Sequence, residues 1–445
     1  MVSAVAPAVP VRREAYQLAV DARDPRFDGV FFVAITTTRV YCRPTCPSRL
    51  AYDRHRRFFD SAAAAERAGF RPCLRCRPEL APGASRAALG AVSRLAQIAA
   101  QRIAAGALNN CTVAALAGEL GVSERHLRRA LEREIGVSPL DLAQTHRLLL
   151  AKRLLADTDL SVTRVAFASG FQSLRRFNAS FREQYGMPPS ALRRKKSSPA
   201  PRSGALQLTL AYRPPLAWDA LLDSLRAVAV PGVEVFEGRR YGRTVRIAGH
   251  AGFVFATDAP GNHVILDVSA SLLPVLMPLI VGMRRLFDLD AEPAVVDAHL
   301  AQGGLGAAVA LRPGVRVPGA LDGFEVALQL LTRGRPCLGD PIETGVPGLT
   351  HLAPTADQIA RAGTGVAARL ARAVTSGALL LEPGSDVEAT RCALIELGGI
   401  GERLTTEIVM RALYWPDAFY TKDRALLARA EAWRPWRAYA ALHLL

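Results

Sequence analysis

The sequence lacks the features of a membrane or secreted protein. No run of about 18 uncharged apolar residues occurs, so no membrane-spanning helix is expected. The N-terminus, MVSAVAPAVPVRREAYQ, has a short apolar run with its arginines on the wrong side for a signal peptide. Only 7 cysteines occur in 445 residues, and an odd number in a large chain argues against a secreted disulfide framework. We therefore expect a cytoplasmic protein with no membrane partner.

Acidic residues are in the minority, but only in one half of the chain. Residues 1–200 hold 32 basic and 16 acidic side chains, whereas the rest of the chain holds 24 of each. The whole formal net charge of +16 therefore lies in the first 200 residues. Such asymmetry indicates a polyanionic partner for the N-terminal half, most often nucleic acid. The alternative is a generally basic, arginine-biased proteome.

Composition and length predict several packed domains. Half of the residues are hydrophobic and 22% are charged, which excludes global disorder. A chain of 445 residues corresponds to about three or four domains. Residues 86–192 have helical spacing, 205–285 contain short alternating strands with some helix, and the last 120 residues return to helix. Breaks are expected near 78–84, 193–204 and 300–318, and no solenoid repeat occurs.

Four cysteines form two close pairs, Cys42-Arg-Pro-Thr-Cys46 and Cys73-Leu-Arg-Cys76, separated by 26 residues. Two such pairs can converge on one tetrahedral Zn²⁺, and thiolate is the soft ligand that selects zinc over magnesium or calcium. The spacing predicts one zinc ion held by Cys42, Cys46, Cys73 and Cys76. Spacing alone leaves open whether this zinc only stabilises a small domain or also takes part in chemistry.

The segments RFDGVFFVAITTTRVYCRPTCPSR and GFRPCLRCRPE resemble the N-terminal domain of the Ada family of methylation-response regulators. The resemblance implies that Cys42 is both a zinc ligand and the acceptor of a methyl group from a methyl phosphotriester in DNA. Zinc keeps such a sulfur ionised, and the thiolate is the nucleophile. Methylation removes one negative charge, so the affinity for DNA should rise. The resemblance places Arg49 at the DNA.

Two helix-turn-helix units follow, in TVAALAGELGVSERHLRRALERE and SVTRVAFASGFQSLRRFNASFREQYGMPPSALRR. Each has a turn glycine and then a serine N-cap before a basic second helix, whose first residues would enter the major groove. An ordinary helical hairpin remains the alternative. The double unit resembles the AraC family over residues 90–194, which implies operator binding and RNA polymerase as a partner. The candidate DNA contacts are Arg125, Arg128, Arg129, Arg175 and Arg176.

Residues 205–445 resemble an AlkA-type DNA glycosylase of the helix-hairpin-helix superfamily. The resemblance rests on RRLFDLDAEP, LRPGVRVPGALDGFEVALQLL, LIELGGIGERLTTEIVMRAL, PDAFYTKDRALL and AEAWRPWRAYAALHLL. It implies excision of alkylated bases of the 3-methyladenine type, with Asp423 as the catalytic aspartate. Backbone N–H groups of a hairpin containing Gly399 and Gly401 would grip phosphate. Trp433 or Trp436 would stack on the extruded base.

The sequence also departs from this glycosylase pattern. The Gly-Gln-x-Val-Ser helix expected after Leu331, which carries the wedge for base extrusion, is replaced by TRGRPCLGDPIETGVPGLTHL. Arg403 and Glu407 stand at usually aromatic places, Lys422 precedes Asp423, and the chain stops inside the last expected helix. Two hypotheses remain. The protein is a repair enzyme and regulator with glycosylase activity, or it is a regulator whose last module has lost its chemistry. In a third, weaker hypothesis the zinc is purely structural.

We predict a multidomain α+β protein. It comprises a zinc-binding α/β domain over 11–82, an all-α double helix-turn-helix domain over 86–194 and a linker over 195–204. An antiparallel sheet with helices follows over 205–300, and a shortened all-α helix-hairpin-helix domain over 301–445. The predicted partner is double-stranded DNA, both methylated and operator DNA.

Overall fold

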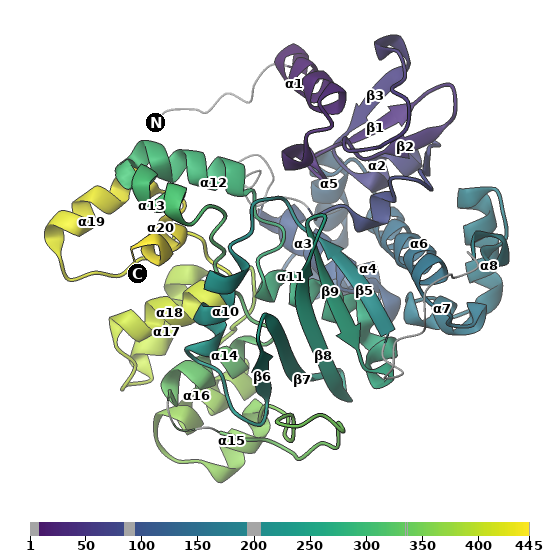
Figure 1. The fold of residues 1–445 in the computed structure, drawn as a ribbon. Helices are drawn as coiled ribbons and strands as arrows, with labels where there is room; N and C mark the ends of the chain where they lie inside the picture. The colour runs from purple at the N-terminus through teal and green to yellow at the C-terminus, as the bar shows by residue number, and fades with distance from the viewer. Residues whose placement is uncertain (1–8, 84–93, 194–205, 334, 336, 445) are drawn as a thin grey trace. The chain divides into compact units, whose positions relative to one another are not determined.

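The structure is a computed structural model that describes residues 9–83, 94–193, 206–333, 335 and 337–444 (Figure 1). The chain forms two compact units. Among the described residues, the first comprises 9–83, 94–193, 209–213 and 274–281, and the second comprises the others. The predicted linker, 195–204, lies outside the described residues.

The first unit begins with a four-stranded sheet in the order β3-β1-β2-β4. Its strands and helices are α1 (Val9–Asp21), β1 (Phe32–Ile35), β2 (Val40–Cys42), β3 (Arg56–Phe59), α2 (Ala62–Arg67) and β4 (Arg71–Pro72). β1 pairs antiparallel with β2 and β3, while β2 and β4 are parallel, with Tyr41 opposite Pro72. Because β2 ends at Cys42 and β4 ends one residue before Cys73, the parallel pairing brings the two cysteine pairs to one sheet end.

Helices complete the first unit. They are α3 (Arg94–Ala104), α4 (Val113–Glu119), α5 (Glu124–Glu134), α6 (Pro139–Asp157), α7 (Val162–Ala168), α8 (Leu174–Tyr185) and α9 (Pro189–Leu192). The predicted serine caps of the second helices are present, because Ser123 and Ser173 accept hydrogen bonds from backbone N–H groups of α5 and α8. The turn glycines Gly121 and Gly170 have φ values of 69° and 85°. At Gly170 a Cβ would also meet Asn109 at 2.4 Å, so this turn accepts only glycine.

Helix α6 packs on the zinc-binding sheet through buried polar groups. The Thr145 hydroxyl donates to the Glu66 carboxylate at 2.6 Å, and the Tyr41 hydroxyl donates to its other oxygen at 2.9 Å. Lys152 is buried, forms an ion pair with Glu79 and donates to the carbonyl of Cys73 at 3.0 Å. The helix that links the two helix-turn-helix units therefore contacts the backbone of a zinc-site cysteine.

Glu66 makes the stability of this packing depend on pH. Burial raises the pKa of Glu66 from 4.5 to about 7, against the hydrogen bonds from Thr145 and Tyr41, which lower it. Glu66 therefore loses its proton at a lower pH in the unfolded chain than in the folded protein. The free energy of unfolding consequently falls as pH rises from about 4.5 to about 7. Glu66→Gln should remove this dependence and be more stable than the parent above pH 7, by at most about 3 kcal/mol. Calorimetry from pH 5 to 8 measures this difference, and parallel pH profiles for the two proteins would contradict it.

Lys152 provides a second stability prediction. Replacing it by methionine leaves the Glu79 carboxylate, which is 1% exposed, with Arg77 at 3.0 Å as its one remaining ionic partner among the described residues. Breaking a buried ion pair by removing one partner costs about 3–5 kcal/mol, and we expect the lower end because Arg77 remains. Urea denaturation of Lys152→Met measures the loss. The double variant Lys152→Met/Glu79→Gln should recover most of it, and a double variant as unstable as the single one would refute the explanation.

A further sheet of five strands has the order β5-β9-β8-β7-β6. Its strands are β5 (Leu206–Ala211), β6 (Glu234–Glu237), β7 (Arg240–Ile247), β8 (His250–Ala259) and β9 (His263–Val268). Strands β6 to β9 pair antiparallel in sequence order. Alternate residues of β9, including Val264, Leu266 and Val268, are buried, as the strand pattern predicts.

Helices make up the remainder of the second half of the chain. They are α10 (Trp218–Arg226), α11 (Leu276–Leu286), α12 (Pro293–Leu300), α13 (Gly306–Leu311), α14 (Gly323–Leu331), α15 (Ala356–Ala362), α16 (Gly365–Thr375), α17 (Val387–Glu396), α18 (Glu402–Ala412), α19 (Arg424–Ala430) and α20 (Arg437–His443). The core of the last helical part is apolar and centres on Phe324, Leu370, Leu394 and Ile408.

The segment that replaces the expected wedge helix contains no helix among its described residues between 332 and 354. It folds back on itself, because Ile342 N–H donates to the Thr350 carbonyl at 2.9 Å and Leu352 N–H to the Asp340 carbonyl at 2.8 Å. The backbone N–H of Thr350 also donates to the carbonyl of Gly232 at 2.8 Å. A short hairpin held on the β6 end of the sheet thus occupies this place.

The predicted fold class is confirmed, with a small zinc-type sheet domain, helix-turn-helix helices, a second sheet and a mostly helical C-terminal part. The predicted domain boundaries remain predictions. One helical stretch, Pro293–Leu311, is long and apolar enough to cross a membrane by length and composition alone. It includes Asp297 and is interrupted at Gly304, whose φ is 88°.

Candidate functional site

The four paired cysteines converge at one end of the first sheet. The sulfur atoms of Cys42, Cys46, Cys73 and Cys76 all lie within 4.8 Å of one another, and these residues are only 7–8% exposed. Sulfur atoms that each lie about 2.3 Å from a tetrahedral zinc ion would have this mutual spacing. Four soft donors and no oxygen ligand fit Zn²⁺. The predicted zinc site of four cysteines is confirmed.

The electrostatics of the cluster also require a cation. Hydrogen bonding with the other three sulfurs, Cys46 first, and then burial raise the pKa of Cys42. Hydrogen bonding with Cys42 lowers the pKa of Cys73 to about 6. Ionisation of one thiol in this cluster therefore makes ionisation of its neighbours harder. A divalent cation among the sulfurs would offset this repulsion and allow all four to be thiolates.

Cys42 differs from its neighbours in its hydrogen bonds. Cys76 Sγ accepts the backbone N–H of Arg43 at 3.3 Å, and Cys73 Sγ accepts that of Arg75 at 3.4 Å. Cys46 interacts with the side chain of Ser48. Among the described residues, Cys42 Sγ receives no N–H or hydroxyl donor. Hydrogen bonds from backbone N–H groups reduce the nucleophilicity of a thiolate, and Cys73 and Cys76 receive such bonds whereas Cys42, among the described residues, does not.

Basic side chains near this centre have two different environments. Arg43 donates to Asp28 at 2.8 Å and to the Cys76 carbonyl at 3.4 Å, so it supports the structure of the loop. Arg49, the predicted DNA contact, is exposed three residues after Cys46. Its exposure is compatible with the predicted role, which stays a prediction.

The candidate arginines of the two helix-turn-helix units lie on α5 and α8. Arg125 and Arg129 are exposed on α5, and Arg175 and Arg176 are exposed in the first turn of α8. Arg128 is only partly exposed, because it pairs with Glu124 one turn earlier on α5 at 2.5 Å. Four of the five predicted arginines are thus available to phosphate or bases as they stand, whereas Arg128 would first have to leave Glu124.

The predicted helix-hairpin-helix is formed by α17, the turn at residues 397–401, and α18. Gly399 has a φ of 80°, and Gly401 caps the N-terminus of α18. Arg369 donates to the carbonyls of Leu397 and Gly398 at 2.6 and 2.9 Å, which fixes the turn. The exposed first turn of α18 presents backbone N–H groups that can bind phosphate. The phosphate-binding role expected for Gly399 and Gly401 stays a prediction.

Asp423, the predicted catalytic aspartate, is exposed at the start of α19. Its carboxylate accepts the backbone N–H groups of Ala425 and Leu426 at 2.8 and 3.2 Å. This N-cap fixes the position of the side chain and leaves its second oxygen, Oδ2, without a hydrogen bond from any described residue. A carboxylate held in this way can face a positive charge without a change of rotamer.

The two tryptophans expected to stack on a base are not presented to one. Trp433 is 0% exposed, donates its indole N–H to the Gly303 carbonyl at 2.9 Å and packs edge-on against Phe419. Trp436 is 6% exposed and packs edge-on against Tyr439. Large aromatic rings near a chain end can serve equally as core, and here the core role accounts for both.

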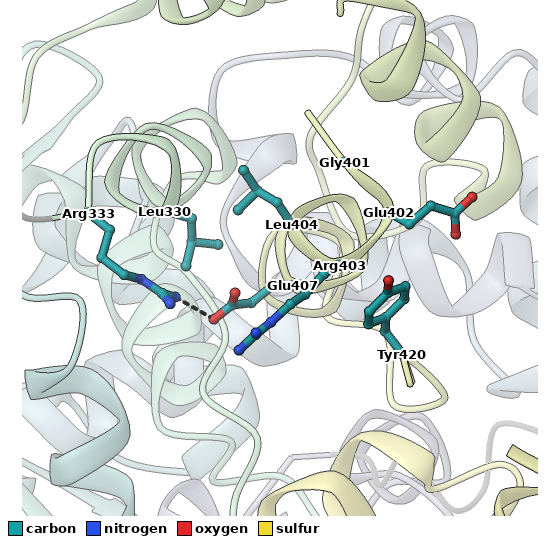
Figure 2. Close-up of a pocket in the computed structure, with 8 residues that line it drawn as sticks. All are labelled: Leu330, Arg333, Gly401, Glu402, Arg403, Leu404, Glu407 and Tyr420. Atoms are coloured by element: carbon teal, nitrogen blue, oxygen red, sulfur yellow. Dashed lines mark hydrogen bonds and ion pairs between the residues drawn. The ribbon is translucent and has the colours of Figure 1, made fainter. Parts of the chain in front are cut away.

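A pocket in the second unit lies beside the turn at residues 397–401 that joins α17 to α18 (Figure 2). It has a volume of about 340 Å³ and is lined by Leu330, Arg333, Gly401, Glu402, Arg403, Leu404, Glu407 and Tyr420. Gly401 comes from the predicted phosphate-binding turn, and Tyr420 lies three residues before Asp423. Sequence reasoning missed Arg333 and Tyr420. The only signal was that Arg403 and Glu407 stand where aromatic residues are usual.

Comparisons with known proteins cover all parts of the chain. Family models match at 15–79 (metal binding domain of Ada), 116–195 (helix-turn-helix domain) and 207–322 (AlkA N-terminal domain). The chain is 36% identical to the "Probable bifunctional transcriptional activator/DNA repair enzyme AlkA" of Mycobacterium tuberculosis. The alignment, 471 residues long with its gaps, covers 96% of this chain and 94% of that protein.

Two Escherichia coli proteins match separate parts. DNA-3-methyladenine glycosylase 2 is 31% identical over 274 residues, which is 53% of this chain and 95% of that enzyme. The bifunctional transcriptional activator/DNA repair enzyme Ada is 33% identical over 172 residues, which is 39% of this chain and 46% of that protein. The resemblances drawn from the motifs are confirmed.

Proposed function

The chain belongs to the family of bifunctional transcriptional activators and DNA repair enzymes that unite an Ada-type zinc domain with an AlkA-type glycosylase domain, and we propose that it performs both activities. It accepts methyl groups from DNA methyl phosphotriesters, regulates transcription by binding DNA, and excises alkylated bases of the 3-methyladenine type. Acting on chromosomal DNA places it in the cytoplasm.

The geometry of the sulfur cluster carries the methyl-acceptor proposal. Zn²⁺, when bound, supplies the charge that keeps the four sulfurs ionised at neutral pH. Cys42 Sγ, which accepts no N–H or hydroxyl hydrogen bond from the described residues, donates an electron pair to the methyl carbon. The bond between the methyl carbon and the ester oxygen breaks, the oxygen stays on phosphorus and takes the electron pair, and the phosphate leaves as an ordinary phosphodiester anion. The sulfur becomes a thioether, so the reaction occurs once per protein molecule.

Regulation follows from the helix-turn-helix units. The proposal assigns Arg125, Arg129, Arg175 and Arg176 to DNA, with Arg49 beside the zinc centre as a further phosphate contact. The excess of basic residues in the first 200 positions supports long-range attraction to a polyanion. RNA polymerase is the partner that a transcriptional activator requires, and we include it in the proposal on that ground alone.

Base excision is assigned to Asp423 and the adjacent pocket. Cleavage of an N-glycosidic bond leaves positive charge on the sugar, and a carboxylate positioned before the reaction stabilises that charge. Water then adds to the sugar carbon, the electron pair of the broken bond leaves with the base, and the proton of the water passes to solvent. The backbone of the hairpin at Gly399 and Gly401 would hold the neighbouring phosphate.

A regulator without glycosylase activity is the alternative. The segment between 332 and 354 forms a hairpin where a wedge helix was expected, and Trp433 and Trp436 are in the core. Base extrusion costs a few kcal/mol, which a wedge and an aromatic pocket normally offset. The observation against this alternative is the pocket of about 340 Å³ that lies beside the turn at residues 397–401 and is lined by Tyr420.

One incubation with methylated DNA tests these proposals together. Released 3-methyladenine is quantified by chromatography, and the peptide bounded by Arg39 and Arg49 is fragmented to locate a methyl group on Cys42 or Cys46. We expect catalytic release of the base and one methyl group on Cys42. Base release without methylation would leave zinc structural. Methylation and DNA binding without base release would establish the regulator alone.

A further inference from the structure

The pocket beside the turn at residues 397–401 contains a charged pair of side chains, whereas the family resemblance predicts aromatic side chains that stack on a base. Arg333, two residues after α14, donates to Glu407 Oε1 on α18 at 2.7 Å, and the two side chains meet on one wall of the pocket (Figure 2). They are 48% and 30% exposed, so the pair is open to a ligand. The volume of about 340 Å³ lies in the range of small-molecule sites.

The pair offers hydrogen-bonding groups of both kinds. Glu407 Oε2 receives no hydrogen bond from any described residue, so it remains an acceptor. The guanidinium of Arg333 has five N–H donors, of which only one is engaged with Glu407 among the described residues. An acceptor and several donors therefore lie next to each other on one wall.

The other walls of the pocket are mainly aliphatic and contain little aromatic surface. Leu330 and Leu404 supply apolar contacts, and Tyr420 is the single aromatic ring among the lining residues. A pocket that relies on several aromatic rings selects an electron-poor base by its face, whatever groups lie on its edge. This pocket has one ring and a charged pair, so the edge of the base decides binding.

We propose that the Arg333–Glu407 pair reads the hydrogen-bonding edge of the extruded base, an inference that rests on the proposed glycosylase function. An adenine-type base presents an exocyclic N–H donor beside a ring-nitrogen acceptor. Glu407 accepts the first and Arg333 donates to the second. A base whose edge is closed by an alkyl bridge has no N–H there, so it covers Glu407 Oε2 without giving that oxygen a donor, and it binds more weakly. Glu407 is thus the residue that determines specificity.

Two free bases test this without requiring turnover. 3-Methyladenine keeps an exocyclic N–H beside a ring nitrogen, whereas 1,N6-ethenoadenine has this edge bridged by carbon. Each is titrated with the full-length protein and followed by ligand-observed NMR. We expect 3-methyladenine to bind at least tenfold more tightly than ethenoadenine.

The variants separate the hydrogen bond from the fold. Glu407→Leu should weaken 3-methyladenine binding about tenfold or more, while Glu407→Gln, which keeps an acceptor oxygen, should retain most of it. Glu396→Leu is the matched control, because Glu396 is an exposed glutamate on α17 that is not among the residues lining the pocket. Arg333→Met, two residues after α14, tests the other half of the pair if the Glu407 variants unfold.

The outcomes distinguish this inference from the proposed function. Binding that depends on Glu407, in a protein that releases no base from methylated DNA, would support the pocket and refute the glycosylase. Base release with equal binding of the two bases, or with no effect of Glu407→Leu and Arg333→Met, would refute the edge-reading pair and leave the glycosylase standing. Absence of 3-methyladenine binding to the parent protein also overturns the inference.

Discussion

Asp423→Asn is expected to lower the rate of 3-methyladenine release from methylated DNA by about a hundredfold or more. The amide keeps the size of the carboxylate but carries no charge to oppose the positive charge on the sugar. Asparagine is nearly as good an N-cap as aspartate, so α19 should keep its start and its position. The expected loss is therefore chemical, and single-turnover release at saturating protein measures it directly.

Asp423→Ala provides the structural comparison. Alanine removes both the charge and the cap that Ala425 and Leu426 N–H groups now use, at a cost of about 1 kcal/mol in helix stability. If asparagine and alanine lose release equally while only alanine lowers the melting temperature, the catalytic role is separated from the cap. Undiminished release by Asp423→Asn would show that another group stabilises the sugar cation, and the assignment of Asp423 would be wrong.

The zinc site could be predicted from sequence because its information is local. Each pair, Cys42 with Cys46 and Cys73 with Cys76, lies in a single turn, so the spacing alone specifies which sulfurs can share an ion. What joins the pairs is the parallel pairing of β2 with β4, through Tyr41 and Pro72. Strands of three and two residues carry almost no pattern, so this pairing could not be predicted from the sequence.

The helix-turn-helix units can also be predicted from the sequence, because serine caps and turn glycines determine helix ends through contacts within one helical turn. The engagement of Arg128 was not anticipated, although Glu124 stands four residues before it, a spacing that favours an ion pair on a helix. A periodic pattern identifies the exposed face of a helix, but it does not say which exposed charges already have partners.

The pocket lined by Arg333 and Glu407 could not be predicted because its walls are distant in sequence. Arg333 and Glu407 are 74 residues apart, and Trp433 lies 130 residues from the Gly303 carbonyl that holds its indole. A tryptophan near a chain end is equally consistent with a ligand-stacking surface and with core. Only the fold decides, and it places Tyr420 rather than either tryptophan at the pocket.

Methylation at Cys42 is expected to raise the affinity for operator DNA by about fivefold at low salt. Four thiolates on Zn²⁺ carry a formal charge of −2, and conversion of one to a thioether leaves −1. A unit charge near a phosphate is worth about 1 kcal/mol in a water-like environment, and this repulsion is lost. Electrophoretic shift assays before and after incubation with methylated DNA measure the change.

Salt and a variant together identify the cause. Because repulsion between exposed charges is screened, the gain in affinity should shrink as ionic strength rises towards 1 M. Cys42→Ser takes up no methyl group, so its affinity should be unchanged by the same incubation, whereas Cys111→Ser, outside the cluster, should behave as the parent. A gain that persists at high salt would point to a conformational change of the zinc domain, and a gain in Cys42→Ser would exclude this sulfur as the switch.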